Sequence, residues 1–163
     1  MSPILNQSAI NEAVNELEMF ATRLVDEFWE ENEERRYTSE AGTLGVRIRH
    51  EHGSRWFRIV WFWNRFGPKK AKNGRKQVYS DEISRGKGYQ YNLNSFKRGR
   101  AWERALAKEL EKRFSEIRKA QDQLKAAQQC VDNFARAARR GMVTIDPEIL
   151  ENLPKTKSQR RRQ

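Results

Sequence analysis

Apolar residues near the N-terminus recur at alternating steps of four and three positions. The series runs through Ile10, Val14, Leu17, Ala21, Leu24 and Phe28. Such spacing places them all on one side of a helix, and acidic residues occupy much of the remainder. Ser8 is a suitable N-cap because its hydroxyl can accept a hydrogen bond from a first-turn N–H. The pattern predicts an amphipathic, acidic helix over residues 8–36.

The period changes from helical to two-residue alternation after Gly42. Apolar side chains alternate with glycine or arginine over Leu44–Arg49, which is typical of a strand with one buried face. The aromatic run Arg55–Trp63 predicts a second strand, and Gly53-Ser54 suits a two-residue turn that joins the two. A third strand is predicted around Gln77–Arg85 from its β-favouring residues.

The register set by that turn makes two further predictions. Three apolar pairs fall on one face, namely Ile48 with Ile59, Val46 with Trp61, and Leu44 with Trp63. On the other face Arg49 opposes Arg58. Because like charges directly opposite one another destabilise a sheet, the arginine pair predicts an anion bound above it.

Helical periodicity returns in the second half of the chain. Apolar residues recur every seven positions at Leu110, Ile117, Leu124, Val131 and Ala138, flanked by Leu106, Phe114, Ala127 and Phe134. This pattern predicts a long helix over residues 94–140, with Gly141 in the position that follows its last turn. Gln121 and Gln128 interrupt the apolar seam, which favours a specific pairing with the first helix and dimerisation through the part left over.

These elements predict an α+β fold with an N-terminal helix, a three-stranded antiparallel sheet, a long C-terminal helix and a basic flexible tail. We expect one domain over residues 1–141, with the acidic helix at 8–36, the basic sheet at 44–91 and the long helix at 94–140. Residues 142–163 form the tail. It contains a candidate docking turn at 146–153 and ends in a polar, basic arm.

Charge is distributed very unevenly along the chain. Residues 1–40 hold ten acidic and three basic residues, whereas residues 44–100 hold fifteen basic and three acidic ones. The whole chain carries a formal charge of +11. A basic, aromatic folded surface of this kind favours a polyanion, and nucleic acid is the commonest. The acidic helix either neutralises part of this body or contacts a different partner.

The candidate DNA-binding residues are three groups of cations and one tryptophan. Strand arginines are expected to project into a groove, and the basic loop 67–76 is expected to contact phosphates. A glycine-rich segment, Arg85–Tyr91, adds two cations. Trp56 and Phe62 either stack on bases or are covered by a helix, while Trp61, Trp63 and Trp102 are expected in the core. The candidates are Arg47, Arg49, Trp56, Arg58, Lys69, Lys70, Lys72, Arg75, Lys76, Arg85 and Lys87.

Catalytic and metal sites find little support in the sequence. His50-Glu51-His52 resembles part of a nuclease metal site, but the pair lies at a predicted turn and the chain has no third histidine. Asp81 and Glu82 are adjacent on a strand and therefore point to opposite faces, so they cannot share a divalent ion with Glu51 without a bulge. We expect no enzyme activity, no metal and no cofactor.

The sequence also bears on where the protein is located and on its redox state. No apolar run reaches the roughly 18–20 residues needed to span a bilayer, and the first residues lack the pattern of a signal peptide. The single cysteine, Cys130, cannot form an internal disulfide. We expect a cytoplasmic protein without a membrane partner.

The order of motifs in the middle of the chain resembles a known family. A basic aromatic hairpin (Gly45–Trp63) is followed by a Lys/Gly loop, by Ile83–Tyr91, by Phe96, and by a helix from Ala101-Trp102-Glu103 through Phe114–Arg118. This order is similar to the MobI-type proteins of integrative conjugative elements and related conjugative plasmids, over about residues 40–120.

The resemblance implies an auxiliary factor that acts at the origin of transfer and helps a relaxase to begin conjugative DNA processing. The expected partners are therefore origin DNA and a relaxase, together with a second copy of the chain. Two alternatives stay open, namely a metal-dependent DNA-nicking nuclease and an RNA-binding or ribosome-associated factor.

Overall fold

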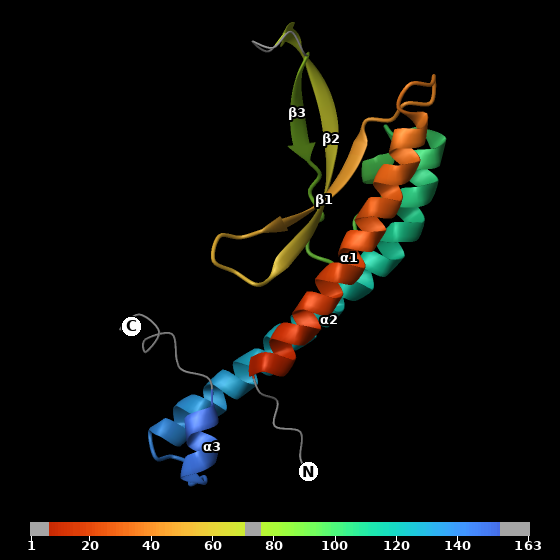
Figure 1. Cartoon of the computed structure of the whole chain (residues 1–163). Coiled ribbons are helices and arrows are strands. Elements are labelled where there is room, and N and C mark those ends of the chain that lie inside the picture. The colour runs from red at the N-terminus through yellow and green to blue at the C-terminus, as the bar shows by residue number, and fades with distance from the viewer. Residues whose placement is uncertain (1–6, 71–75, 154–163) are drawn as a thin grey trace. The chain divides into compact units, whose positions relative to one another are not determined.

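The computed structural model describes residues 7–70 and 76–153 and has the α+β architecture predicted from the sequence (Figure 1). A long helix precedes a three-stranded sheet, and a longer helix follows it. The elements are α1 (Gln7–Arg35), β1 (Leu44–His50), β2 (Phe57–Lys70), β3 (Lys76–Glu82), a short 3-10 turn η1 (Leu93–Phe96), α2 (Ala101–Arg139) and α3 (Pro147–Asn152).

The chain folds into two compact units. One, here called the sheet unit, spans Glu18–Lys119 and holds the sheet with parts of α1 and α2. The other, here called the helical unit, combines Met1–Leu17 with Ala120–Gln163. Both long helices contribute to both units.

The sheet is antiparallel with the order β1-β2-β3, and its register matches the predicted one. Leu44 pairs with Trp63, Val46 with Trp61, Ile48 with Ile59 and Arg49 with Arg58. The predicted two-residue turn is wrong, because the ladder ends at His50 and Phe57 and leaves a six-residue connection. Its tight part is formed by the Ser54 N–H, which donates to the Glu51 carbonyl at 2.9 Å. Gly53 has a φ of +72° there, a conformation that glycine adopts readily.

Aromatic rings form the centre of the sheet unit. The ring of Trp61 is fully buried and meets Phe28 from α1 at 5.3 Å, Phe96 from η1 at 5.2 Å and Phe114 from α2 at 6.0 Å between centroids. The predicted core position of Trp61 is therefore confirmed, and Trp63 is buried as well. Within this unit α1 and α2 run side by side and antiparallel, as the contact of Arg35 with Trp102 and the Glu27–Arg113 ion pair indicate.

The first turn of α2 is fixed by a buried carboxylate. The helix starts at Ala101 and not near Asn94, the predicted start. Glu103 accepts a hydrogen bond from the Arg100 N–H at 2.7 Å, which satisfies a donor of the first turn. Its other oxygen accepts the Leu44 N–H, also at 2.7 Å, and so joins α2 to the beginning of β1. Gly42 is required beside this contact, because a Cβ there would lie 2.1 Å from Glu103 Oε1.

The helical unit ends in a small cluster around α3. The last turn of α2 is closed by the predicted glycine, since Gly141 has a φ of +71° and the Met142 N–H donates to the Ala137 carbonyl at 3.1 Å. Leu153 packs on α2, which confirms the predicted docking segment, and Arg139 donates to its carbonyl. The cluster contains Ala135, Ala138 and Leu153, with Ile145 against it.

The heptad seams are buried over most of their length. Ile10 and Val14 are 1% exposed, and the two interrupting glutamines, Gln121 and Gln128, are buried. Phe134 was predicted to flank the seam, but it is 42% exposed. None of the helices in the described ranges carries an apolar stretch long enough to cross a membrane.

Candidate nucleic-acid interface

Three arginines share one face of the sheet, here called the arginine face. Arg47 and Arg49 lie on β1, and Arg58 lies on β2 as the cross-strand partner of Arg49. Alternation along a strand directs all three side chains to the side opposite Trp61. The sequence-based placement of these arginines is confirmed, whereas their contact with DNA stays a prediction.

Glu82 supplies negative charge to this face. Its carboxylate accepts a hydrogen bond from Arg47 at 3.0 Å and pairs with Arg49 as well. The hydrogen bond from Arg47 lowers the pKa of Glu82 below its usual value. An anion was predicted above the Arg49–Arg58 pair, and β3 itself provides one for Arg49. Arg58 is exposed and has no ion-pair partner among the described residues.

Packing from α1 holds the arginine face in position. The guanidinium of Arg47 lies 4.5 Å from the ring centroid of Phe62, and Trp29 packs against the same ring. Phe62 is only 5% exposed, so it is covered and is not a base-stacking platform. Gly45 is opposite Phe62 and leaves room for the ring, since a Cβ there would lie 2.5 Å from it. Trp56 lies partly buried in the β1–β2 connection, beside Arg55.

The predicted basic loop is shorter than residues 67–76. β2 continues to Lys70 and β3 begins at Lys76, and these two residues are cross-strand partners. The register shifts between Phe66 and Lys70, which lets Pro68 stay in a strand although it has no N–H to donate. Lys69, Lys70 and Lys76 therefore belong to strands, whereas Lys72 and Arg75 lie outside the described residues.

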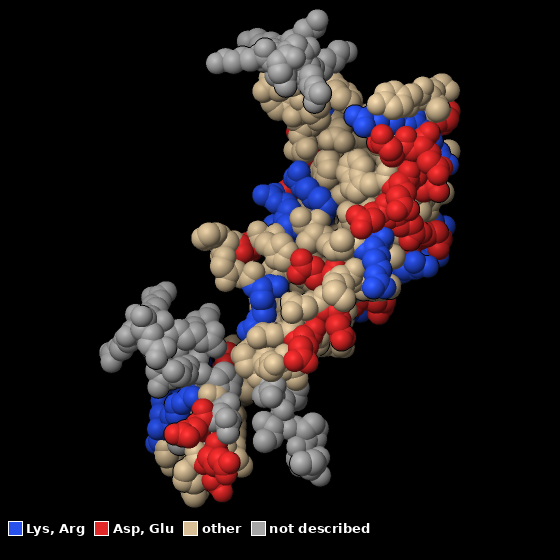
Figure 2. Space-filling model, in the orientation of Figure 1, with Lys and Arg blue, Asp and Glu red and all other residues tan. Residues whose placement is uncertain are grey.

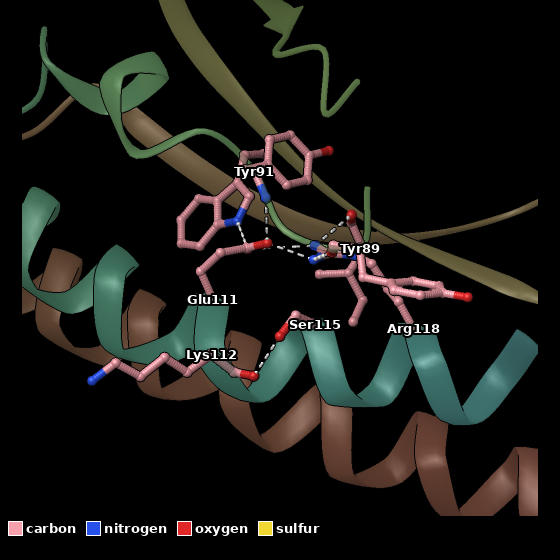
Figure 3. A network of polar contacts seen from close by, with 8 residues as sticks. Tyr89, Tyr91, Glu111, Lys112, Ser115 and Arg118 are labelled. Carbon is pink, nitrogen blue, oxygen red and sulfur yellow. Dashed lines mark hydrogen bonds and ion pairs between the residues drawn. The ribbon is translucent and has the colours of Figure 1, made fainter. Parts of the chain in front are cut away.

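A buried ion pair holds the glycine-rich segment that carries Arg85 and Lys87 (Figure 3). Glu111 and Arg118 on α2 point toward this segment and pair at 2.5 Å, with both side chains nearly inaccessible. Glu111 accepts the Tyr91 N–H at 2.9 Å, and Arg118 donates to the Tyr89 carbonyl at 2.6 Å. The segment that follows β3 is thus fixed to α2 by charged hydrogen bonds.

The same ion pair also reaches the aromatic core. Glu111 accepts a hydrogen bond from Trp61 Nε1 at 2.8 Å, and Arg118 lies over the ring of Tyr91 at 5.1 Å. Burial raises the pKa of the Tyr91 phenol above its ordinary value, so this ring is neutral. One buried pair therefore joins α2, β2 and the glycine-rich segment.

The candidate metal residues are engaged in other contacts. His50 is the last residue of β1, and its Nε2 lies 2.8 Å from Glu18 Oε1 on α1. Asp81 pairs with Arg65 at 3.2 Å, while Glu82 pairs with Arg47 and Arg49. These two carboxylates therefore serve opposite faces of β3. No group of three His, Cys, Asp or Glu side chains in the described residues could hold a metal ion.

Charge of opposite sign gathers on different elements. Figure 2 shows acidic side chains along α1 and basic side chains over the sheet. Arg49 and Arg58 belong to the basic sequence identified above, and both are exposed on the folded sheet. This arrangement gives an anion a defined place to bind.

Sequence reasoning missed the buried charges on α2. Glu103, Glu111 and Arg118 occupy the same stripe as Ala107, Leu110 and Phe114. A charged residue on a buried apolar stripe needs a partner. The position of these three charges on that stripe was therefore the signal in the sequence that could have revealed them. The role of Glu82 was hidden for another reason, because β3 must first be placed beside β2 before its carboxylate can be seen near two arginines of β1.

Comparison with known proteins agrees with this arrangement of elements. The chain matches the family described as MobI protein over residues 17–132, a range that includes most of α1, the whole sheet and most of α2. The match extends further than the resemblance noted over residues 40–120, so most of the acidic helix belongs to it. No curated protein and no solved structure matches. The chain belongs to the MobI family and is a conjugative transfer protein.

Proposed function

We propose that this protein is a non-enzymatic, DNA-binding accessory factor that acts at the origin of transfer and helps a relaxase to begin conjugative DNA processing. Family membership provides the conjugative setting. The arginine face supports the DNA-binding part of the proposal, because it places three arginines on the adjacent strands β1 and β2, and the Glu82 carboxylate pairs with two of them.

Because its arginines are held in place, this face favours recognition of a DNA sequence over nonspecific electrostatic attraction. Arg47 is held against Phe62 and Glu82. The strands fix the backbone positions from which the side chains of Arg49 and Arg58 extend. A planar guanidinium that starts from a fixed backbone can read guanine with two hydrogen bonds. We therefore expect these fixed, partly neutralised arginines to contact base edges in a groove, and not only the phosphates of the DNA backbone.

Duplex DNA is the form that the arginine face fits best. Phe62, which would be a stacking platform for single strands, is covered by Trp29. Single-strand binders usually stack bases on exposed aromatic rings, a role that the covered Phe62 cannot take beside the arginines. Arg49 and Arg58, by contrast, are exposed on β1 and β2, where a groove of a duplex can approach.

The test compares the affinity of the full chain for three nucleic acids at one fixed salt concentration. The probes are a duplex from the origin region of the element that encodes the protein, the corresponding single strand, and an RNA hairpin of equal length. We expect the duplex to bind most tightly, and a scrambled duplex to bind more weakly. Tightest binding to RNA would replace this function with the RNA-binding alternative.

A second experiment addresses the enzymatic alternative. Purified protein is incubated with supercoiled origin DNA and Mg²⁺, and open circles are measured with and without added relaxase. We expect the protein alone to leave the DNA closed and to increase nicking by the relaxase. Nicking by the protein alone, abolished by chelation, would show a nuclease.

A further inference from the structure

β2 and β3 continue beyond the end of β1 as a two-stranded ribbon. β1 pairs with β2 only as far as Trp63, whereas β2 and β3 stay paired out to Lys70 and Lys76. We call residues 64–70 and 76–80 the β2–β3 ribbon. In Figure 1 it extends away from β1.

The ribbon exposes an apolar pair on the arginine face. Phe66 and Val78 are cross-strand partners, and they are 58% and 52% exposed. Phe66 lies an even number of residues from Arg58 and Phe62 along β2, so these three side chains share one face of the strand. The arginine face and the apolar pair thus lie on the same side of β2, with the covered Phe62 between them.

Charges beside the apolar pair indicate what covers it. Lys69 and Lys70 follow Phe66 in the sequence, and Lys76 precedes Val78 by two residues. The ribbon is therefore basic by sequence, and two copies of a basic segment repel one another, which opposes association through this pair. A polyanion with an apolar interior meets both requirements, because its charge complements the lysines while its interior accepts the two side chains.

We propose that Phe66 and Val78 form an apolar wedge that enters the minor groove of duplex DNA and partly unstacks one base step. Apolar side chains of this kind insert between base steps from the minor groove and bend the duplex. Eight residues separate Phe66 from Arg58, about 26 Å of strand at ~3.3 Å per residue. With β2 aligned along the duplex axis, 3.4 Å per base pair puts the wedge roughly eight base pairs from the groove that the arginines contact.

The inference rests on the proposed duplex binding and adds a distortion to it. A base step that is already unstacked requires less energy to open, so a wedge binds it more tightly. The probes are two origin-region duplexes of equal length, one fully matched and one with a single T·T mismatch, each with fluorophores at both ends. Affinity and end-to-end energy transfer are measured for the wild type, Phe66→Ala, Phe66→Leu and Arg58→Ala.

The wedge predicts a distinct response for each variant. The wild type binds the mismatched duplex roughly tenfold more tightly than the matched one and shortens the end-to-end distance. Phe66→Ala loses both the preference and the bend, whereas Phe66→Leu keeps them because an apolar side chain remains. Arg58→Ala loses affinity for both duplexes but keeps their ratio.

Failure of the proposed function and failure of the wedge give different results. If the wild type binds neither duplex, the proposed function is wrong and the wedge with it. If the wild type binds both equally without bending, or Phe66→Ala behaves as the wild type does, only the wedge is wrong. Sedimentation of the same variants provides the last check, because conversion of a dimer to a monomer by Phe66→Ala would assign the pair to contact between copies.

Discussion

Arg49 and Arg58 are direct cross-strand partners, yet within the part of the chain that the structure describes only Arg49 is paired with a carboxylate, that of Glu82. Two like charges in this position destabilise a sheet unless an opposite charge lies nearby. Glu82 relieves this repulsion from one side and leaves the Arg58 guanidinium available to an external anion. The two arginines therefore differ in their contacts, although the sequence pattern gives them equivalent positions.

Loss of Arg58 is expected to reduce discrimination between DNA sequences. Arg58→Ala should weaken binding to the origin duplex by ~1–3 kcal/mol and affect a scrambled duplex less, because a strand-held guanidinium can read a base edge. Fluorescence anisotropy over a salt series measures both. The matched control is Arg113→Ala on α2, an exposed arginine away from the sheet.

Lys72 provides the contrasting case within the basic segment. Lys72→Ala should lower the slope of log affinity against log salt by about 0.9 and weaken both duplexes equally, as loss of one phosphate contact does. Equal losses for Arg58→Ala and Lys72→Ala on both duplexes would show that the sheet does not read sequence.

Removal of the Glu82 carboxylate is expected to strengthen DNA binding. Glu82→Gln keeps the shape of the side chain but frees Arg47 and Arg49 for an external phosphate. We expect affinity to rise roughly two- to fivefold, the range of a partly exposed ion pair. Asp81→Gln removes an acid from the other face of β3 and serves as the control. Weaker binding by Glu82→Gln would mean that the carboxylate orients the arginines for DNA.

Acid should break the Glu82 contacts only below the ordinary range of a glutamate. The hydrogen bond from Arg47 lowers the pKa of Glu82, so its folded-state pKa lies below the unfolded value. The stabilisation from this group is therefore fully present above the unfolded pKa and is lost as the pH falls through the folded one. An NMR titration of the Glu82 side-chain carboxyl checks this. A midpoint at or above the ordinary glutamate value would contradict it.

Disruption of the buried ion pair should destabilise the protein strongly. Glu111→Gln leaves the Arg118 charge buried without its counter-charge, which we expect to lower the free energy of unfolding by about 3–5 kcal/mol. Urea denaturation followed by tryptophan fluorescence measures the change. Glu116→Gln, at an exposed pair on the same helix, should change it by less than about 1 kcal/mol. In the double variant with Arg118→Met, part of the stability should return.

Gly45 is expected to tolerate no side chain. In Gly45→Ala the new methyl group would lie 2.5 Å from the Phe62 ring, so the ring or the strand must shift, at ~1–3 kcal/mol of stability. Arg47 stacks on this ring, and DNA affinity should therefore fall as well. Gly88→Ala is the control, because its Cβ would approach no atom closer than 4.0 Å. Recovery of stability by Phe62→Leu in the Gly45→Ala background would confirm the steric cause.

The sequence predicted those parts of the fold that follow from local periodicity. The alternation over Leu44–Arg49 was sufficient to obtain the register with β2, including the Arg49–Arg58 pair, although the turn itself was wrong. The register survived because the predicted turn and the real connection have the same centre. The two long helices followed from their heptad spacing in the same way.

Features that depend on tertiary contacts were not predictable in this way. Gly67-Pro68 reads locally as a turn, but a register shift keeps both residues within β2. Glu82 became a partner of Arg47 only through the order of the strands. The cover on Phe62 comes from Trp29, a residue that local pattern assigns only to a polar helix face.

The indole of Trp29 also donates a hydrogen bond to the Val46 carbonyl at 2.8 Å, and β1 is an outer strand of the sheet. The indole occupies the space beside this carbonyl, so an incoming strand would have to displace it, and Trp29 protects the β1 edge at Val46. The opposite border, formed by β3, has no comparable guard among the hydrogen bonds of the described residues. An extended peptide that lengthens this sheet meets the Trp29 indole beside β1, so we expect the sheet to grow more readily on the β3 side.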